Sequence, residues 1–499
     1  MHWRSILLFV LFRLLNLFLI RTWFVPDEIF QSVEVAHASV FGIGTLTWEW
    51  THSLRSVFHP FVISLLFRFL RFFSLDTNFA IILFPRLLHS LLFAFADLFF
   101  LKLAIRFLPT LTAAKYALFS YMSCWFIWYC APRTLSNNLE MILTLIALNW
   151  YPFSLSRKSS SCQMVWPYMT VGVVTIFIRP TAVLFWVPLG LWHLWRVDHP
   201  FMLLYKTCLP SMLPVLAISI LLDSFIYHRF TITIWNFAKF NVFEGGSGHF
   251  GVHPWHWYIS QGLPLTFGVQ LIAVAGGLLL VLKQKSVSLL PFLLSVWYIL
   301  FHSCLAHKEH RFVLPIMPLM CLYAGNFLAR SAYRRLFVFL ILAFNIPLAL
   351  YSGLFHQIGP CSAVKELTSM LSSAERRSEN SSTLVLLMPC YSLPHYSYFH
   401  GFNVSFVSLD CSPNLDHIVN YVDESDSFHN DPVFWMLSNR SKWLSATYLI
   451  MYEKSFRKVE ELLKSEAFFL CSVIFHAHFL TSVNQDHFIV IASRLCSDR

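Results

Sequence analysis

Residues 6–20 read ILLFVLFRLLNLFLI, and residues 21–34 continue RTWFVPDEIFQSVE. The first stretch is almost wholly apolar, and no small-residue cleavage site follows it, so it predicts an uncleaved membrane span rather than a signal peptide. The second stretch places Asp27 and Glu28 directly after that span. The chain is therefore predicted to enter the membrane near its amino terminus and to leave it beside two carboxylates.

The composition extends this prediction to the whole chain. Of 499 residues, 57% are hydrophobic and 12% are charged, whereas soluble globular chains carry about 25% charged residues. The 51 Phe and 17 Trp residues are more aromatic surface than a water-soluble domain can bury. The net charge of +10 comes from Lys and Arg in ones to threes between apolar stretches, as the positive-inside rule produces. The composition therefore argues against a large soluble enzyme and against a nucleic-acid-binding protein.

Apolar stretches about 20 residues long recur up to residue 355, and each predicts a span. Together with residues 5–20 they predict an all-α polytopic membrane protein of about eleven helices. Only Arg179 and Pro180 separate two of these stretches, which form either two short spans or one re-entrant pair. The further predicted spans are residues 79–101, 112–131, 137–155, 164–179, 181–196, 207–227, 264–282, 287–303, 312–329 and 336–355.

The charge pattern predicts the orientation of these spans. If the amino terminus is cytosolic, each predicted cytosolic loop contains Lys or Arg, as the positive-inside rule requires. An odd number of spans then places the chain after about residue 356 in the lumen. That tail holds glycosylation sequons at Asn380, Asn403 and Asn439. The tail cysteines would also lie in an oxidising compartment, and their pairing is left open.

Two domains are predicted. Residues 1–356 form the multi-span module, and its long first lumenal loop, residues 21–78, contains an apolar stretch at 57–73. The placement of Arg68 and Arg71 in that stretch indicates an amphipathic helix lying on the membrane. Residues 357–499 have ordinary polarity, and their short apolar strings alternate with a helix-like segment, which predicts a small C-terminal α/β lumenal domain.

Asp27 and Glu28 open a predicted helix in the first lumenal loop. Pro26 suits its first turn, and the following residues are predicted to make the helix amphipathic. The two carboxylates lie where the head group of a lipid-linked substrate would sit, or they only favour the positive end of the helix. Further along, Trp48 and Glu49 lie near Arg55 and predict either an anchor at the head-group level or a sugar-stacking surface.

A second ionisable cluster lies between two predicted spans on the lumenal side. Residues 307–311 are His, Lys, Glu, His and Arg, and five such groups at a membrane surface are costly to keep there without partners. Three interpretations are open: a cationic clamp for a lipid phosphate, a solvated turn, and a metal site built on His307 and His310.

Other polar residues lie at or inside the predicted spans. Arg133 and Arg179 add two cations at the lumenal face. Asp97 lies inside a span and is either a functional acid or a partner of a neighbouring helix. The glycine- and aromatic-rich residues 235–258 form either a mobile loop that closes on a substrate or an ordinary turn leading to an aromatic belt.

Taken together, these strings resemble the motifs of the dolichyl-phosphate-mannose-dependent α-mannosyltransferases with a GT-C fold. The resemblance runs from about residue 10 to 455. Within the family, the segments at 253–258 and 388–392 are similar to the branch that adds the third mannose to the glycosylphosphatidylinositol (GPI) precursor. Ile29-Phe30 departs from the pattern, since relatives often carry two larger aromatic residues there. The matching strings are Asp27-Glu28, Thr47-Trp48-Glu49-Trp50, Arg133-Thr134-Leu135, Arg179-Pro180-Thr181 and His307-Lys308-Glu309-His310-Arg311-Phe312.

The resemblance implies an inverting α-1,2-mannosyltransferase of the endoplasmic reticulum membrane, with dolichyl-phosphate-mannose as donor and a GPI-precursor glycolipid as acceptor. Phosphate leaves without a general acid, so one base, Asp27, is expected to take the acceptor proton, with Glu28 positioning the acceptor. Cations would stabilise the leaving phosphate. No metal and no cofactor are expected, and protein partners are left open. The residues expected to bind substrate are Trp48, Glu49, Arg55, Arg133, Arg179, His307, Lys308, Glu309, His310 and Arg311.

Two other functions remain as alternatives. A sibling mannosyltransferase of N-glycan precursor assembly shares the acidic pair and the cationic string. A multi-span lipid or solute transporter, from a different class, also explains the spans and the basic loops, although no internal repeat is visible.

Overall fold

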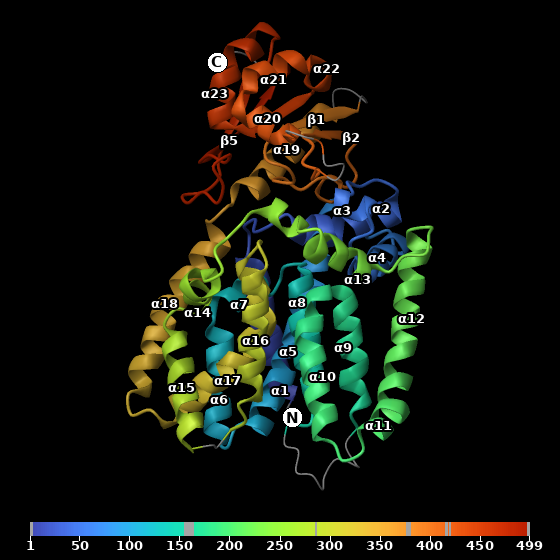
Figure 1. Ribbon diagram of the computed structural model, residues 1–499. Helices are drawn as coiled ribbons and strands as arrows, with labels where there is room; N and C mark the ends of the chain where they lie inside the picture. Colours follow the sequence, from blue (N-terminus) through green and yellow to red (C-terminus); the bar gives the residue numbers. More distant parts are fainter. Residues whose placement is uncertain are drawn as a thin grey trace. The chain divides into compact units, whose positions relative to one another are not determined.

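The computed structural model describes residues 3–153, 164–284, 287–375, 381–414, 418 and 421–496. The chain divides into two compact units (Figure 1). Unit 1 comprises Met1–Phe18, Glu49–Val62 and Arg86–Ala349, and unit 2 comprises Leu19–Trp48, Ile63–Pro85 and Leu350–Arg499.

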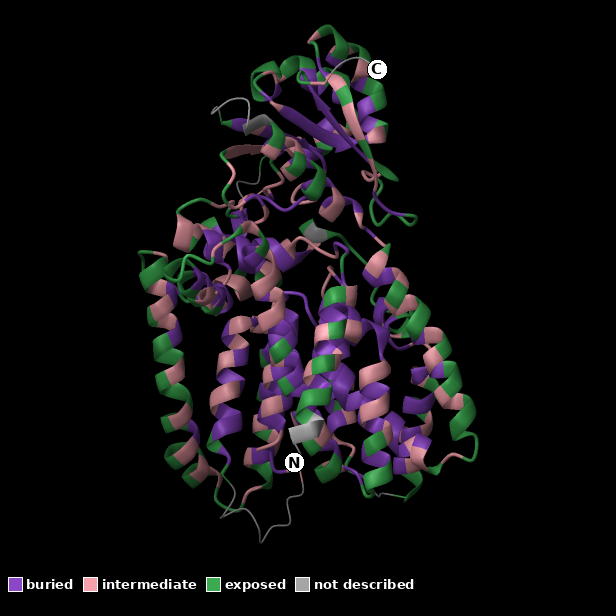
Figure 2. Ribbon diagram, turned by 180° about the vertical axis from the view of Figure 1, so that it is seen from behind, coloured by how far each residue is buried: buried purple, intermediate pink, exposed green. Residues whose placement is uncertain are grey.

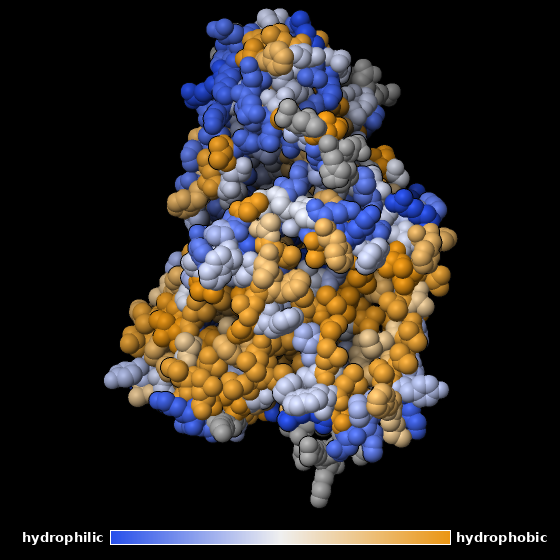
Figure 3. Space-filling model, in the orientation of Figure 1, coloured by the Kyte–Doolittle hydropathy of each residue, from blue (hydrophilic) through white to orange (hydrophobic). Residues whose placement is uncertain are grey.

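Unit 1 is a bundle of helices with many apolar side chains on the face seen in Figure 3. Buried residues lie along the inward faces of the helices (Figure 2). Its principal helices, some of which continue into unit 2, are α1 (Trp3–Leu19), α5 (Asn78–Phe107), α6 (Leu111–Ser123), α7 (Trp125–Cys130), α8 (Ser136–Leu148), α9 (Trp166–Ile178), α10 (Val183–Arg196), α12 (Leu209–Ile226), α15 (Gln270–Gln284), α16 (Leu290–Cys304), α17 (Met317–Arg330) and α18 (Arg334–Leu354).

Glycines allow the central helices of unit 1 to approach closely. Helix α17 packs against both α6 and α15. A Cβ atom added at Gly325 of α17 would lie 2.4 Å from the backbone nitrogen of Ala117 in α6, and one at Gly277 of α15 would lie 1.9 Å from the carbonyl oxygen of Tyr323. Small residues at such crossings are typical of membrane helices, where association depends on close packing.

An ion pair joins α1 to α5 inside the bundle. The Arg13 guanidinium donates from Nε and Nη2 to the two carboxylate oxygens of Asp97 at 2.8 and 2.7 Å, and both side chains are buried. Paired and doubly hydrogen-bonded charges are the form in which intramembrane ions are tolerated. Of the two interpretations of Asp97, the structure therefore supports the bond to a neighbouring helix.

The predicted spans are present as apolar helices, but their number stays a prediction. Within the described residues, four helices are long and apolar enough to cross a membrane, or five if the bent pair Tyr258–Phe267 and Gln270–Gln284 is one span. Several other apolar helices, such as α8 and α9, have only 10–17 residues. The stretch around residue 180 forms two helices, α9 and α10, joined by a short turn, η2 (Pro180–Ala182).

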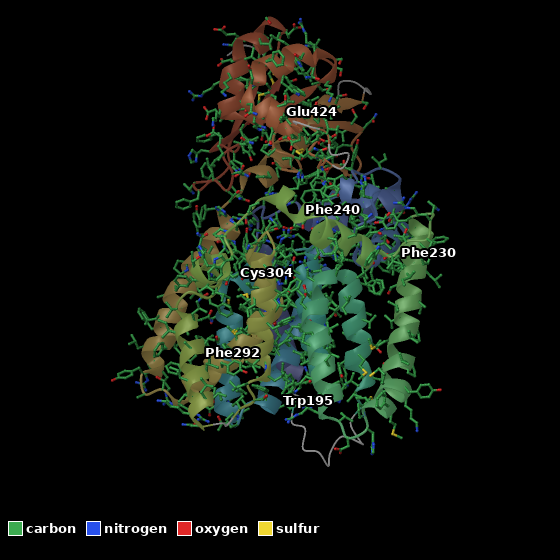
Figure 4. The ribbon with its side chains drawn as sticks, in the orientation of Figure 1. Trp195, Phe230, Phe240, Phe292, Cys304 and Glu424 are labelled. Atoms are coloured by element: carbon green, nitrogen blue, oxygen red, sulfur yellow. A yellow bond between two sulfur atoms is a disulfide. The ribbon has the colours of Figure 1, made fainter. Side chains whose placement is uncertain are left out.

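Exposed aromatic residues mark the ends of the apolar band. Trp195, 73% exposed, lies at the carboxyl end of α10, and Phe230, 80% exposed, follows the carboxyl end of α12. The two residues lie at opposite ends of unit 1 (Figure 4). Aromatic side chains gather at membrane interfaces, which agrees with helices that run between two membrane surfaces.

Unit 2 has a five-stranded sheet in its tail, as the α/β prediction requires. The strand order is β2-β1-β3-β5-β4, with β2, β1 and β3 parallel and β5 antiparallel to both β3 and β4. The strands are β1 (Ser382–Leu387), β2 (Val404–Ser408), β3 (Tyr448–Tyr452), β4 (Phe469–Phe475) and β5 (Phe488–Ser493). The tail helices are α19 (Gly359–Glu375), α20 (Glu424–Asn430), α21 (Pro432–Ser438), α22 (Arg440–Trp443) and α23 (Glu453–Ser465).

The alternation of side chains along the strands builds a core on each face of the sheet. Val385 and Leu449 point to the face covered by α21 and α23, whereas Leu384 and Ile450 point to the face covered by α19. Among the described tail residues, disulfides join Cys390 to Cys411 and Cys471 to Cys496. Neither disulfide includes Cys361.

The first loop packs with the tail in unit 2. Helix α2 (Glu34–Phe41) and the stretch before it form a core with part of helix α4 (Phe58–Phe72), the helix predicted at 57–73, and with Tyr391 and Tyr398 of the tail. The prediction that the helix after Asp27 is amphipathic is wrong, because all residues from Glu28 to Glu34 are buried. The tail covers what the sequence pattern suggested would be a polar face.

Candidate active site

The acidic pair begins a helix whose first turn follows from Pro26. The backbone N–H groups of Ile29 and Phe30 both donate to the carbonyl of Pro26 at 3.0 Å, so the proline carbonyl closes the first turn. Asp27 is half-buried and Glu28 is 3% exposed. A π-helical turn, η1 (Ile29–Val33), separates the pair from α2. Such turns are rare and occur frequently at functional sites.

Glu34 connects this helix to the tail. Its two carboxylate oxygens accept from the backbone N–H groups of Thr45 at 3.1 Å and of Ser397 at 3.0 Å. The side chain is completely buried, and burial raises its pKa above the ordinary carboxyl value, an effect that the hydrogen bonds from Ser397 and Thr45 partly offset. Glu34 was not among the predicted site residues, because its partner Ser397 lies 363 residues away in the sequence.

Histidines of the loop and the tail meet beside this contact. The ring nitrogens of His37 and His400 are hydrogen-bonded at 2.9 Å, and Thr45 is hydrogen-bonded to Nδ1 of His395 at 2.8 Å. Burial lowers the pKa of His37 to about 4 and that of His395 to about 3. Both imidazoles are therefore neutral near pH 7 and act as hydrogen-bonding groups.

In unit 1, the predicted Glu49 and Arg55 form an ion pair. The Arg55 guanidinium donates to the Glu49 carboxylate at 2.7 Å, and it lies over the ring of Phe237 at 5.8 Å. The Tyr227 hydroxyl donates to the backbone carbonyl of Arg55 at 2.7 Å. Trp48, which opens helix α3 (Trp48–Thr51) and belongs to unit 2, is 8% exposed.

Asp223, at the carboxyl end of α12, fixes the backbone beside Arg55. One carboxylate oxygen accepts from the Ser56 hydroxyl at 2.9 Å and from the Val57 N–H at 3.0 Å. The other accepts from the Thr233 hydroxyl at 2.7 Å. Asp223 is completely buried. No sequence pattern indicates Asp223, because it lies 167 residues from Ser56 and is a single acidic residue in an apolar stretch.

The cationic string 307–311 is internally paired. Arg311 donates to Glu309 through Nε at 2.6 Å and Nη2 at 2.5 Å, and Nε2 of His307 contacts the same carboxylate at 2.8 Å. Burial alone would raise the pKa of Glu309, but Arg311 and His307 hold it well below its usual range. Arg311 thus makes a bidentate contact with Glu309; the phosphate clamp stays a prediction.

The other members of the string face the backbone and an aromatic ring. Lys308, 2% exposed, donates to the carbonyls of His253 at 2.9 Å and Leu305 at 2.5 Å, and burial lowers the pKa of its amine. The His310 ring lies 4.7 Å from the Trp257 ring. The aromatic-rich segment 253–258 is therefore packed against the string, and whether it closes on a substrate stays a prediction.

Arg179 ties the string to the start of α8. It forms an ion pair with Glu140 at 3.0 Å and donates to the Asn137 side-chain oxygen at 3.1 Å. Asn137 in turn donates to the backbone carbonyl of Arg311 at 3.2 Å. Glu140 and Asn137 were not among the predicted site residues, although Asn137 lies just after the matching string Arg133-Thr134-Leu135.

The predicted residues thus fall into two groups. Unit 1 brings together Arg179 and the 307–311 string through Asn137. Arg133 precedes Asn137 in the sequence and donates to the carbonyl of Tyr129 at 3.2 Å. Asp27, Glu28 and Trp48 belong to unit 2. Within the described part of the chain, no group of three His, Cys, Asp or Glu side chains is arranged to hold a metal ion. Of the sequons, Asn403 is exposed and Asn439 half-buried, whereas Asn380 lies outside the described residues.

The chain resembles known proteins over nearly its whole length. A protein of Danio rerio named GPI alpha-1,2-mannosyltransferase 3 is 37% identical over 474 residues, which cover 94% of this chain and 86% of that protein. The Homo sapiens protein of the same name is 34% identical, and the match covers 93% of this chain and 82% of that protein. GPI mannosyltransferase 3 of Candida albicans is 30% identical, and the match covers 97% of this chain and 96% of that protein.

The fold resembles that of a solved structure, ArnT. The crystal structure of ArnT from Cupriavidus metallidurans bound to undecaprenyl phosphate superposes with a TM-score of 0.59 and covers 97% of each chain at 12% identity. This likeness confirms the predicted fold class. The profile described as the Alg9-like mannosyltransferase family matches residues 5–400, which include the acidic pair and the cationic string. The chain therefore belongs to the Alg9-like mannosyltransferase family.

Proposed function

We propose that this protein transfers the third mannose, in an α-1,2 linkage, from dolichyl-phosphate-mannose to the GPI precursor at the lumenal face of the endoplasmic reticulum membrane. The observation that carries the proposal is the identity of 34–37% to vertebrate proteins named GPI alpha-1,2-mannosyltransferase 3 over 93–98% of this chain. Their names supply the acceptor class and the linkage.

Asp27 is the proposed base. The acceptor hydroxyl loses its proton to the Asp27 carboxylate as its oxygen attacks the anomeric carbon of the donor, and the bond from that carbon to the phosphate oxygen breaks. The phosphate takes the bonding electrons and leaves as an anion on the lipid. A single displacement inverts a β-linked donor to an α-linked product. Glu28, which lies next to Asp27 and is buried, positions the acceptor.

The cations of unit 1 are the proposed partners of the donor phosphate. Arg311 and Lys308 are held rigidly by Glu309 and by backbone carbonyls, so they are preorganised for the charge that develops on the leaving group. ArnT, which shares the fold, was crystallised with undecaprenyl phosphate, a polyprenyl phosphate of the same chemical kind as the proposed donor's lipid phosphate. In this scheme Arg311 is shared between Glu309 and the phosphate, and no cofactor is required.

Two observations support a lumenal tail. Disulfides persist in oxidising compartments, and both disulfides of the described residues lie after residue 389. Cys124, Cys208, Cys304 and Cys321, in the described part of unit 1, are in no disulfide. The proposed topology also places Asn403 and Asn439 where glycosylation occurs.

Complementation separates this function from its alternatives. We expect expression in cells that lack the third-mannose step to restore GPI-anchored proteins at the cell surface, and restoration to fail when the cells are also deprived of dolichyl-phosphate-mannose synthesis. Repair of the N-glycan precursor instead would identify the sibling enzyme. Microsomal transfer of radiolabelled mannose from the lipid donor to GPI intermediates, in the presence of a chelator, tests the donor and the absence of a metal requirement. Transport without mannosyl transfer would overturn the proposal.

A further inference from the structure

The loop between β4 and β5 exposes apolar side chains. Residues 476–485 read HAHFLTSVNQ and contain no Lys, Arg, Asp or Glu. Phe479 is 70% exposed, Leu480 is 39% exposed and Val483 is 85% exposed. Three large, exposed apolar side chains on a loop that carries no Lys, Arg, Asp or Glu are unusual for a surface that faces only water.

This loop is bound to the end of α18 within unit 2. The Tyr351 hydroxyl is hydrogen-bonded to Nδ1 of His478 at 3.3 Å, and the rings of Tyr351 and Phe479 lie 6.1 Å apart. The Gln357 side chain donates to the Thr481 hydroxyl at 3.0 Å. Three successive contacts therefore fix the loop beside residues 351–357.

Helix α18 locates the loop relative to the bilayer. The apolar helical stretch Arg334–Ser373 is one of the four in the described residues that are long and apolar enough to span a membrane. Residues 351–357 comprise the last turn of α18 and the three residues that follow it. Phe355 is 52% exposed and its ring stacks with Tyr351 at 6.5 Å. Exposed aromatic rings at the end of a span are characteristic of the membrane–water interface.

We infer that residues 478–483 insert into the head-group and acyl boundary of the bilayer and hold the tail domain against the membrane. The occupant of this apolar surface is lipid, because the loop is fixed to the end of a membrane span rather than to a part of the domain that faces away from it. A charge-free tip with one aromatic and two aliphatic side chains has the chemistry of an interfacial anchor. The inference rests on the membrane span alone and is independent of the donor and acceptor proposed above.

The same domain offers a matched control. Helix α21 exposes Val433, Phe434 and Leu437 by 37%, 67% and 50%. This helix covers the opposite face of the sheet from α19, and α19 is the helix that continues from the end of α18. The control patch is therefore as apolar as the loop but is not fixed to a span.

Lipid photolabelling tests the inference. The full-length protein is placed in phosphatidylcholine nanodiscs that contain a phosphatidylcholine with a diazirine on its acyl chain, irradiated, and digested for mass spectrometry. We expect adducts on residues 478–483 and on Phe339, an exposed residue of α18, and none on residues 433–437. Adducts on Phe339 without adducts on 478–483 would overturn the inference.

Hydrogen exchange gives a second measurement that does not depend on labelling chemistry. Replacement of Phe479 and Val483 by Ser should raise exchange of residues 476–487 in nanodiscs by about tenfold, because the lipid no longer shields the loop. The double replacement of Phe434 and Leu437 by Ser should leave that segment unchanged. Protection that requires two copies of the chain in one nanodisc would show that a protein, and not lipid, covers the loop, and would equally overturn the inference.

Discussion

At the residue scale, a single carboxylate organises the cationic string. Glu309 accepts both guanidinium donors of Arg311 and the ring of His307. Because Arg311 and His307 depress the pKa of Glu309, the pair is ionised above the ordinary carboxyl pKa and its stabilisation is lost only as the pH falls through the lowered value. The geometry of Arg311 is therefore constant across the physiological pH range.

A double-mutant cycle tests whether Glu309 acts through Arg311. Arg311→Lys keeps the charge but loses the bidentate geometry, and Glu309→Gln removes the charge that orients Arg311. We expect each to raise the donor KM about tenfold or more, since each breaks a charged hydrogen bond worth about 1.5–3 kcal/mol. The double variant should lose less than the product of the two effects. Independent, multiplicative losses would show that Glu309 does not act through Arg311.

Substitution of Asp27, the proposed base, should reduce kcat strongly. Asp27→Asn keeps the size of the side chain and removes the base, so kcat should fall by about 10²–10⁴-fold, while protein level and binding of the lipid donor change little. Asp198→Asn, at an exposed aspartate between α10 and the helix beginning at Pro200, is the control. Normal turnover by the Asp27 variant in a microsomal mannosyl-transfer assay would remove Asp27 from the role of base.

At the scale of elements, buried carboxylates join segments that are distant in sequence. Glu34 holds the helix of the acidic pair to the tail, and Asp223 holds the segment of Arg55 to α12. Glu34 accepts two backbone N–H groups, whereas Asp223 accepts one backbone N–H and two hydroxyl groups; loss of a buried acceptor leaves such donors unsatisfied, which is costly. The two carboxylates thus position the elements that carry Asp27 and Arg55.

The Glu34 contact should impose a pH dependence on the stability of the tail. Burial raises the pKa of Glu34, so its contribution to the free energy of unfolding falls as the pH rises from the ordinary carboxyl range through the raised value. Glu34→Gln should remove this part of the dependence and lower stability by about 1–3 kcal/mol, because the amide cannot accept at both positions. Thermal unfolding against pH, with the exposed Glu366→Gln as control, measures both effects. Parallel curves for the variant and the wild type would contradict this role.

Two substitutions of Asp223 should loosen the backbone at residues 53–57 to different degrees. Asp223→Asn retains one acceptor oxygen, whereas Asp223→Ala leaves the Val57 N–H and two hydroxyls without their partner. Hydrogen exchange of residues 53–57 should rise moderately in the first variant and by about tenfold or more in the second, with activity falling in the same order. Unchanged exchange in the Ala variant would mean that α12 does not fix this segment.

At the scale of the whole molecule, the disulfides of the tail test whether the tail lies in the lumen or in the cytosol. Disulfides that close loops with sequence separations of 21 and 25 residues stabilise a domain by about 3 kcal/mol each in the loop-entropy model. Reduction should therefore lower the unfolding temperature of the tail by several degrees, and non-reducing peptide mapping should recover the Cys390–Cys411 and Cys471–Cys496 pairs. Recovery of free thiols at these four positions from intact cells would contradict a lumenal tail.

Glycan mapping tests the same orientation independently. Endoglycosidase treatment should increase the gel mobility of the protein, and Asn403→Gln should remove one step of that shift because Asn403 is exposed. Asn439 donates its side-chain amide to the carbonyl of Trp435, so we expect lower occupancy there. Full-length protein without any glycan, combined with reduced cysteines, would place the tail in the cytosol.

The sequence by itself determined the membrane character, the helical class, the α/β tail and the family strings, because hydropathy, charge and short motifs are local properties that one stretch of chain displays without its neighbours. It also located Pro26 at the first turn of the acidic helix, since the preference of proline for that position needs no tertiary partner.

Only the tertiary structure decided which charges are already paired. The Arg13–Asp97 pair spans 84 positions and the contact of Glu34 with Ser397 spans 363, and no periodicity records such distances. For the same reason the sequence could not show that the acidic helix is buried on all sides, nor that Glu140 and Asp223 belong beside the predicted site. Desolvation, which makes each of these carboxylates require a partner, acts only once the chain has folded.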